Sequence, residues 1–117
     1  MKSNERENPR YFAQLQVKIE DFPLSTINIS LDGTQLSCNR MIGDILQKNI
    51  ESDSINLILS LNDKINVKIK CEEKYFSSYD DTEYLIGLKF IEFYDNSREI
   101  LEAFISENAG HLLRLVK

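Results

Sequence analysis

Residue types that carry covalent or metal chemistry are scarce in this chain. Its 117 residues include one histidine, two cysteines and four glycines. Cys38 and Cys71 lack the C-x-x-C spacing of a metal or redox motif, and with His111 they cannot complete a closed zinc site. The sequence offers no Ser/His/Asp or Cys/His grouping and no glycine loop that would cradle a phosphate. We therefore expect no catalytic site, no metal and no cofactor.

Long apolar runs are also missing. No segment approaches the roughly 20 apolar residues of a membrane-spanning helix, and the first residues, MKSNEREN, contain no hydrophobic signal core. We expect a cytoplasmic protein that does not insert into a membrane. In that reducing compartment Cys38 and Cys71 are interpreted as small core or half-buried residues, with a disulfide between them left open.

Positive charge is in the minority. The chain has 14 Lys and Arg against 19 Asp and Glu, which gives a formal net charge of −5. An acidic field repels polyanions, so DNA, RNA or an anionic membrane surface would need a local basic patch. Two of the five arginines, Arg6 and Arg10, lie within the first ten residues. Functional positive charge is therefore expected to be local, and we predict no DNA or RNA partner.

Short segments of alternating apolar and polar residues dominate what is present. The alternation is typical of half-buried strands and is clearest over residues 11–20, 55–61 and 65–72, and further strands are expected over residues 25–30, 34–38 and 84–93. Turns are expected at Asp21-Phe22-Pro23 and at Asn62-Asp63. Six short strands with turns between them predict a mainly β fold, a small antiparallel barrel or sandwich, and the length fits a single domain.

A helix is predicted after the last strand, at about residues 97–109. Asn96 offers an N-cap with Glu99 three positions later, as in a capping box, and Gly110 is a suitable stop. An apolar stripe runs along the helix at Ile100, Leu101, Phe104 and Ile105. Because the strand at 84–93 is apolar on both faces, we expect it between the barrel interior and this helix. Residues 112–116 are expected to pack back on the sheet. Residues 39–54 are left open between a short helix and an irregular connection.

Two short patterns lie at the start of the chain. The first, Arg6-Glu7-Asn8-Pro9-Arg10, sets two guanidinium groups four positions apart in a polar segment that we interpret as a mobile arm. The second, Asn28-Ile29-Ser30-Leu31-Asp32-Gly33, follows a strand. If Ile27 and Ile29 face the core, the period of two makes Asn28 and Ser30 project together from the opposite face. Gly33 can take a positive φ or let another backbone approach closely.

Together these patterns resemble the R-x-x-x-R and [D/N]-x-S-x-x-G signatures of the PilZ family. The segment 84–90, with Gly87 and Phe90, is similar to the Gly-x-x-Phe strand that precedes the C-terminal helix in that family. The resemblance implies a six-stranded antiparallel β-barrel followed by a helix. It divides the chain into a flexible arm, residues 1–10, and one PilZ-like barrel domain, residues 11–117.

The resemblance also implies a ligand, the bacterial second messenger cyclic di-GMP. Arg6 and Arg10 match arginines that contact guanine and phosphate from a flexible loop. Asn28, Ser30 and Gly33 match the barrel-face motif that meets a guanine and the ligand backbone. The implied role is a non-catalytic signalling receptor or adaptor, a monomer by default, that acts on a downstream protein partner.

Three alternatives stay open. A PilZ-like domain can serve as a protein–protein interaction module that binds no nucleotide, although its motifs are then usually eroded. An OB-like barrel that binds single-stranded nucleic acid would need a basic groove with exposed aromatics, which an acidic chain disfavours. Both motifs also admit a purely structural interpretation, as a solvated basic pair and as turn chemistry. The aromatic cluster of Tyr75, Phe76 and Tyr79 fits either a partner surface or packing at a hairpin end.

Overall fold

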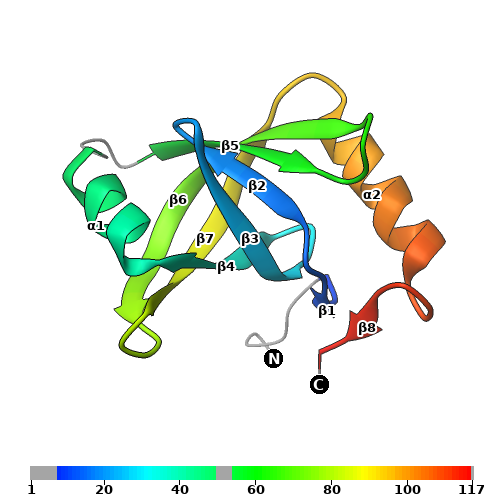
Figure 1. The fold of residues 1–117 in the computed structure, drawn as a ribbon. Coiled ribbons are helices and arrows are strands. Elements are labelled where there is room, and N and C mark those ends of the chain that lie inside the picture. Colours follow the sequence, from blue (N-terminus) through cyan, green and yellow to red (C-terminus); the bar gives the residue numbers. More distant parts are fainter. Residues whose placement is uncertain (1–7, 50–53, 117) are drawn as a thin grey trace, which may run out of the picture.

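Six antiparallel strands close into a barrel (Figure 1). The computed structural model describes residues 8–49 and 54–116. The strands are β2 (Gln16–Ile19), β3 (Phe22–Ile29), β4 (Gly33–Asn39), β5 (Ser54–Ser60), β6 (Asn66–Ser78) and β7 (Glu83–Phe93). They are paired in the order β2-β5-β6-β7-β4-β3, and pairing of β3 with β2 closes the barrel. The predicted six-stranded antiparallel barrel with a C-terminal helix is confirmed.

Two further short strands extend the sheet beyond β3. These are β1 (Tyr11–Phe12) and β8 (Arg114–Leu115), which pair with each other while β1 also pairs with β3. The single strand predicted over residues 11–20 is therefore divided in two. Between the two strands, the Thr26 hydroxyl of β3 donates a hydrogen bond to the carbonyl oxygen of Ala13 and accepts one from the N–H of Leu15. Residues 112–116 were expected to pack back on the sheet, and Arg114 and Leu115 do so by pairing with β1, while Leu112 is 71% exposed.

The alternating residues bury one face of each strand in the barrel interior. Nine hydrophobic strand residues are at most 1% exposed: Val17, Ile19, Ile29, Leu36, Leu57, Leu59, Val67, Ile69 and Cys71. Burial of a large aliphatic side chain contributes about 1.5–3 kcal/mol, so this row supplies the main stabilising term. Cys38 and Cys71 are buried and free, as interpreted from the sequence. Ile65 begins the strand predicted over residues 65–72, but it is 40% exposed because it precedes β6 in the hairpin loop.

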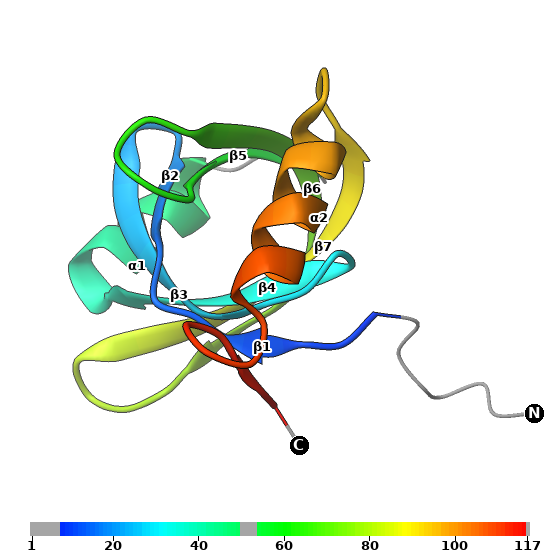
Figure 2. The ribbon, with the colours of Figure 1, turned by 90° about the vertical axis from the view of Figure 1, so that its right-hand side faces the viewer.

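Two helices lie at opposite ends of the barrel, α1 (Arg40–Asn49) and α2 (Ser97–Asn108) (Figures 1 and 2). The undecided segment 39–54 therefore forms a helix over its first part, while residues 50–53 lie outside the described residues. Gly43 allows this helix to dock on Tyr84, since a Cβ at position 43 would lie 2.1 Å from Cδ2 of that ring. Neither described helix is long and apolar enough to cross a membrane.

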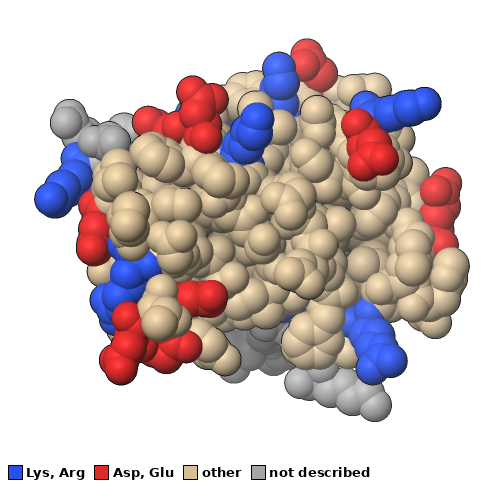
Figure 3. Space-filling view, in the orientation of Figure 1, with Lys and Arg blue, Asp and Glu red and all other residues tan. Residues whose placement is uncertain are grey.

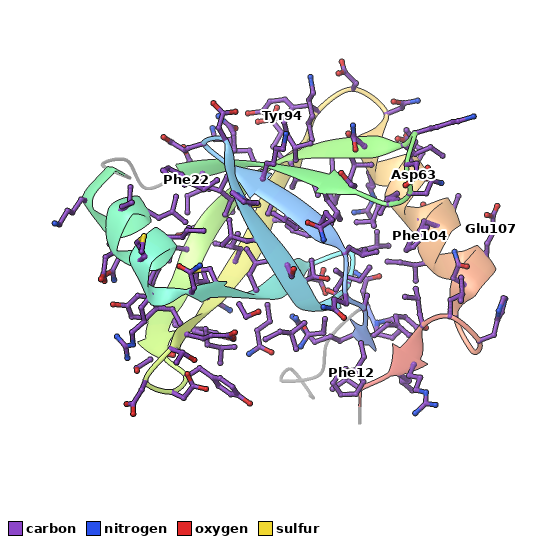
Figure 4. The ribbon with its side chains drawn as sticks, viewed as in Figure 1. Phe12, Phe22, Asp63, Tyr94, Phe104 and Glu107 are labelled. Carbon is purple, nitrogen blue, oxygen red and sulfur yellow. The ribbon has the colours of Figure 1, made fainter. Side chains whose placement is uncertain are left out.

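Helix α2 ends one residue before the predicted boundary, and its apolar stripe is confirmed. Leu101 is fully buried, and the other stripe residues pack against the core. Figure 4 shows Phe104 on the side of α2 that faces the barrel and Glu107 on the outer side. The predicted capping box is wrong, because the Asn96 side chain makes no cap hydrogen bond. Instead the buried hydroxyl of Ser97 accepts a hydrogen bond from the backbone N–H of Lys68, which links the first turn of α2 to β6.

Two other predictions about the strands are wrong. The turn before β3 is Glu20-Asp21, whose φ values of 52° and 72° suit a tight hairpin, rather than Asp21-Phe22-Pro23. The outer face of β7 is not covered by α2, which packs on β6. Ile91 stays 49% exposed because the β6–β7 register skips it: Lys70 pairs with Glu92 and Cys71 with Phe90.

Candidate functional site

A single row of opposed residues crosses four neighbouring strands on the outer face of the barrel. Asn28 on β3 lies opposite Gln35 on β4, and Gln35 lies opposite Gly87 on β7. Gly87 in turn lies opposite Tyr75 on β6. Directly opposed residues of an antiparallel sheet point to the same face. The row therefore presents two amides and one phenol together, separated by a position without a side chain.

Hydrogen bonds run along this row. Asn28 Nδ2 donates to Gln35 Oε1 at 2.9 Å. Gln35 Nε2 donates to the Tyr75 hydroxyl at 2.6 Å, which is possible because Gly87 between them carries no side chain. These bonds fix the orientation of the amides, so the polar atoms of the row are preorganised.

Arg10 joins the row at its β3 end. Its Nη1 donates to Asn28 Oδ1 at 2.5 Å. The residue directly precedes β1, where Phe12 lies opposite Asn28, and this pairing brings the arginine to the Asn28 side chain. Arg10 and Asn28 belong to the two separate patterns in the sequence, and the fold brings them into contact. Arg6 lies outside the described residues, so its contribution stays a prediction.

A pocket of about 540 Å³ lies over this row, within the range of small-molecule sites. Its walls include Arg10, Asn28, Gln35, Lys74 and Tyr75. A smaller hollow of about 180 Å³ shares Arg10 and Lys74 with it and continues towards Gly33 and Lys89. Three cationic side chains, Arg10, Lys74 and Lys89, and one carboxylate, Asp32, therefore line the two hollows. In a chain of net charge −5, this is the local positive charge that an anionic ligand needs.

The turn after β3 supports the smaller hollow. Ser30 is fully buried, and its hydroxyl accepts the N–H groups of Asp32 at 2.9 Å and Gly33 at 3.2 Å. The carbonyl oxygen of Asp32 accepts the N–H of Phe90 at 2.8 Å, which ties the turn to β7. Ser30 thus differs from the expectation that it projects beside Asn28, because β3 ends at Ile29 and the alternation ends with it. A contact of Ser30 with the ligand stays a prediction.

Gly33 is required for a close approach of two strands. A Cβ at this position would lie 2.3 Å from the carbonyl oxygen of Leu88 on β7. No side chain fits at that distance without moving backbone. The predicted close approach of another backbone to Gly33 is confirmed.

Two β-bulges determine which side chains face the candidate site. In the β3–β4 ladder Thr26 pairs with Leu36 and Asn28 with Gln35, so Ile27 is skipped. Ile27 consequently lies outside the core cluster, contrary to the expectation that it points inward, while Ile29 is fully buried. A bulge of this kind lets two successive residues share a face, which leaves Asn28 on the outside.

The second bulge lies in β6. Glu73 pairs with Leu88 and Tyr75 with Gly87, so Lys74 is the skipped residue. Both Lys74 and Tyr75 line the pocket as a result. Sequence reasoning did not assign them or Gln35 to the site. Strict alternation from the buried Cys71 would have placed Tyr75 in the barrel interior, so the periodicity of the sequence could not indicate that Tyr75 lies at the site.

Other hollows on the surface lack this combination of groups. One of about 470 Å³ is lined by Phe12, Ile27 and Leu112, together with Arg114. In Figure 3 the charged side chains lie around the rim of the face shown, and its middle is largely uncharged. Shifted pKa values also occur elsewhere: a hydrogen bond to Asp44 raises the pKa of Tyr84, and hydrogen bonds from Thr82 lower that of Asp80. The pocket over the cross-strand row is therefore the candidate site.

Comparison with known proteins identifies similar folds. No family model and no curated protein sequence matches the chain. The Bacillus subtilis inhibitor of motility (MotI/DgrA) has a TM-score of 0.67 at 16% identity, covering 89% of this chain and 51% of that chain. The PlzA protein of Borreliella burgdorferi, solved in complex with c-di-GMP, has a TM-score of 0.51 at 16% identity, covering 92% and 49%. The chain spans about half the length of each, and these likenesses show a shared fold.

Proposed function

We propose that this protein is a non-catalytic receptor for cyclic di-GMP. The observation that carries the proposal is the hydrogen bond from Arg10 Nη1 to Asn28 Oδ1, at the edge of a pocket large enough for a small molecule. It joins the R-x-x-x-R pattern to the Asn-x-Ser-x-x-Gly pattern at one place. The likeness to PlzA, solved with c-di-GMP, supports the same ligand class.

The chemistry of the pocket suits a ligand with two guanines and two phosphates. A guanidinium presents a planar fork that takes two acceptors of a guanine edge or of a phosphate. The Asn28 amide offers both a donor and acceptors to a base edge. In the proposed complex Arg6 and Arg10 bind guanine and phosphate, Asn28 meets a guanine, and Ser30 and Gly33 shape the turn against which the ligand backbone lies.

We further propose that the bound protein acts as an adaptor in the cytoplasm. Binding changes the arm and the surface around it, and a downstream protein partner recognises the change. Ordering of an arm costs about 1–2 kcal/mol per fixed residue, so a micromolar Kd is expected.

Calorimetric titration of cyclic di-GMP tests the proposal. Wild-type protein is expected to bind saturably, and Arg6→Ala/Arg10→Ala is expected to lose binding by about 100-fold or more, because both forks are removed. Arg98→Ala is the matched control, since Arg98 is an exposed arginine on α2 that contacts Phe93 rather than the pocket. Absence of binding to folded wild-type protein would overturn the receptor hypothesis and favour the protein-interaction module.

A further inference from the structure

We propose that Tyr75 is the surface of this pocket on which a purine base of the ligand stacks. The proposal rests on the proposed function and adds a residue that neither sequence pattern contains. Stacking by an aromatic ring requires three things of the residue: a place at the ligand, an open ring surface and a fixed orientation. Tyr75 meets each of them.

The first requirement is met by the β6 bulge. Tyr75 lies in the same cross-strand row as Asn28 and lines the same pocket as Arg10. A base whose edge meets Arg10 and Asn28 therefore occupies a cavity that has an aromatic wall. Aromatic side chains stack on bases of any identity, because every base has a π face.

The second requirement is met by Gly87. A Cβ at position 87 would lie 2.2, 2.5 and 2.7 Å from three atoms of the Tyr75 ring, so the ring rests directly on the β7 backbone. Despite this support, Tyr75 is 40% exposed. A large aromatic residue with its ring supported on one side and accessible on the other is the arrangement that a stacked base uses.

The third requirement is met by Gln35. Its Nε2 donates to the Tyr75 hydroxyl at 2.6 Å, and its Oε1 accepts from Asn28. The ring is thus held in place through the same amides that lie beside Arg10. A ring that is already oriented loses little conformational entropy when a ligand binds.

The neighbouring aromatics do not share this arrangement. Phe76 contacts Tyr84 edge-on at a centroid distance of 5.0 Å and packs, partly buried, against the hydrophobic core, so its ring is used in packing of the hairpin. Tyr79 is 66% exposed near the end of the hairpin and is not among the residues that line the pocket. Of the aromatic cluster seen in the sequence, Tyr75 alone lines the pocket within the part of the chain that the structure describes.

Three variants and one spectroscopic measurement test the proposal. Tyr75→Leu removes the ring and is expected to weaken cyclic di-GMP binding about 10- to 100-fold by calorimetry. Tyr75→Phe keeps the ring and loses only the Gln35 bond that orients it, so its affinity is expected to fall about two- to tenfold, less than that of Tyr75→Leu. Tyr79→Leu is the matched control from the same hairpin and is expected to bind like wild type.

The ring protons of Tyr75 in wild-type protein provide a readout that packing alone does not move. A guanine stacked on the ring is expected to shift the NMR resonances of the Tyr75 ring protons upfield as cyclic di-GMP saturates the site. Because this measurement uses wild-type protein, it remains valid even if Tyr75→Leu folds poorly. Wild-type affinity in folded Tyr75→Leu, or unshifted Tyr75 resonances at saturation, would overturn the stacking proposal and leave the receptor hypothesis intact. No binding to wild-type protein would remove both, because the stacking proposal rests on the receptor function.

Discussion

The backbone N–H of Val116 donates a 2.8 Å hydrogen bond to the carbonyl oxygen of Arg10. Strand β8, which ends one residue earlier, pairs with β1 through Tyr11 with Leu115 and Phe12 with Arg114. The side chain of Arg10 lines the candidate pocket while its backbone holds the C-terminal strand. The two ends of the described chain therefore meet at the site, as Figure 2 shows for β1 and the segment that leads to the C-terminus.

This contact predicts that ligand binding protects β8. Cyclic di-GMP that holds the Arg10 side chain also restrains its carbonyl oxygen, so hydrogen exchange of the Val116 amide is expected to slow about tenfold at saturation. The amide of Leu61, which is bonded to Ile65 in a hairpin outside the pocket, is the control and is expected to be unchanged. Unaltered exchange at Val116 during saturable binding would show that the strand and the ligand are uncoupled.

Substitution of Gly33 is expected to damage both stability and binding. In Gly33→Ala the new Cβ meets the Leu88 carbonyl oxygen at 2.3 Å, and forcing β4 and β7 apart is expected to cost about 1–3 kcal/mol of unfolding free energy. The same displacement moves the turn beside the pocket, so affinity for cyclic di-GMP should fall. Urea denaturation and calorimetric titration measure the two effects.

Gly110→Ala is the comparator for this prediction. Gly110 has a φ of 91°, and a Cβ at this position would meet nothing within 4 Å, so the substitution introduces backbone strain of about 1 kcal/mol and no clash. Its binding is expected to match wild type, because Gly110 lies in the loop after α2. If Gly33→Ala proves as stable as wild type, the strands accommodate a methyl group and the close approach is not required.

Gly43→Ala is expected to separate stability from binding. A Cβ at position 43 would lie 2.1 Å from the Tyr84 ring. Two contacts hold this ring in place: its hydroxyl donates to Asp44 Oδ1 at 2.5 Å, and the Arg40 guanidinium lies 4.5 Å from its centroid. The free energy of unfolding of Gly43→Ala, measured by urea denaturation, is expected to be about 1–3 kcal/mol lower than that of wild type. Affinity for cyclic di-GMP should be unchanged, since α1 does not line the pocket.

Gln47→Ala, an exposed substitution in the same helix, controls for effects of helix propensity and is expected to stay within about 0.5 kcal/mol of wild type. A weakened affinity in folded Gly43→Ala would mean that α1 and the pocket communicate through the barrel.

The two cysteines are expected to be inert in the folded protein. Burial raises the pKa of Cys38 to about 11, with Glu83 and Asp44 adding to the shift, and raises that of Cys71 to about 12. The reactive thiolate is therefore scarce at pH 8. Ellman's reagent should label neither thiol of the native protein and both in denaturant without reductant, whereas rapid labelling of native protein would contradict the burial.

The same shifts give a direction for the pH dependence of stability. Because the folded pKa values lie above the ordinary value of 9.0, the folded protein holds these protons more tightly than the unfolded chain. The stability that these thiols contribute is complete below pH 9 and is lost as the pH rises through 11 and 12. Urea denaturation of wild type and of Cys71→Ala across this range measures the difference.

Much of the fold follows from local pattern. The pleat of a strand has a period of two, so alternation alone identified Val17, Ile19, Val67 and Ile69 as core residues, and each is at most 1% exposed. The apolar stripe around Leu101 identified α2 in the same way. For the site, the resemblance of two sequence patterns to PilZ signatures proposed Arg10, Asn28 and Gly33 and implied cyclic di-GMP as the ligand, and their role in binding stays a prediction.

The remaining features depend on which strands become neighbours. The bulges at Ile27 and Lys74 arise from pairing with β4 and β7. The first removes Ile27 from the core, and the second places Tyr75 on the outer face, each against strict alternation. The contact of Tyr75 with Gly87 and Gln35 joins residues far apart in the chain. Alternation is a property of one strand and can be taken from its residues. Register is a property of a pair of strands, and closure of the barrel sets it.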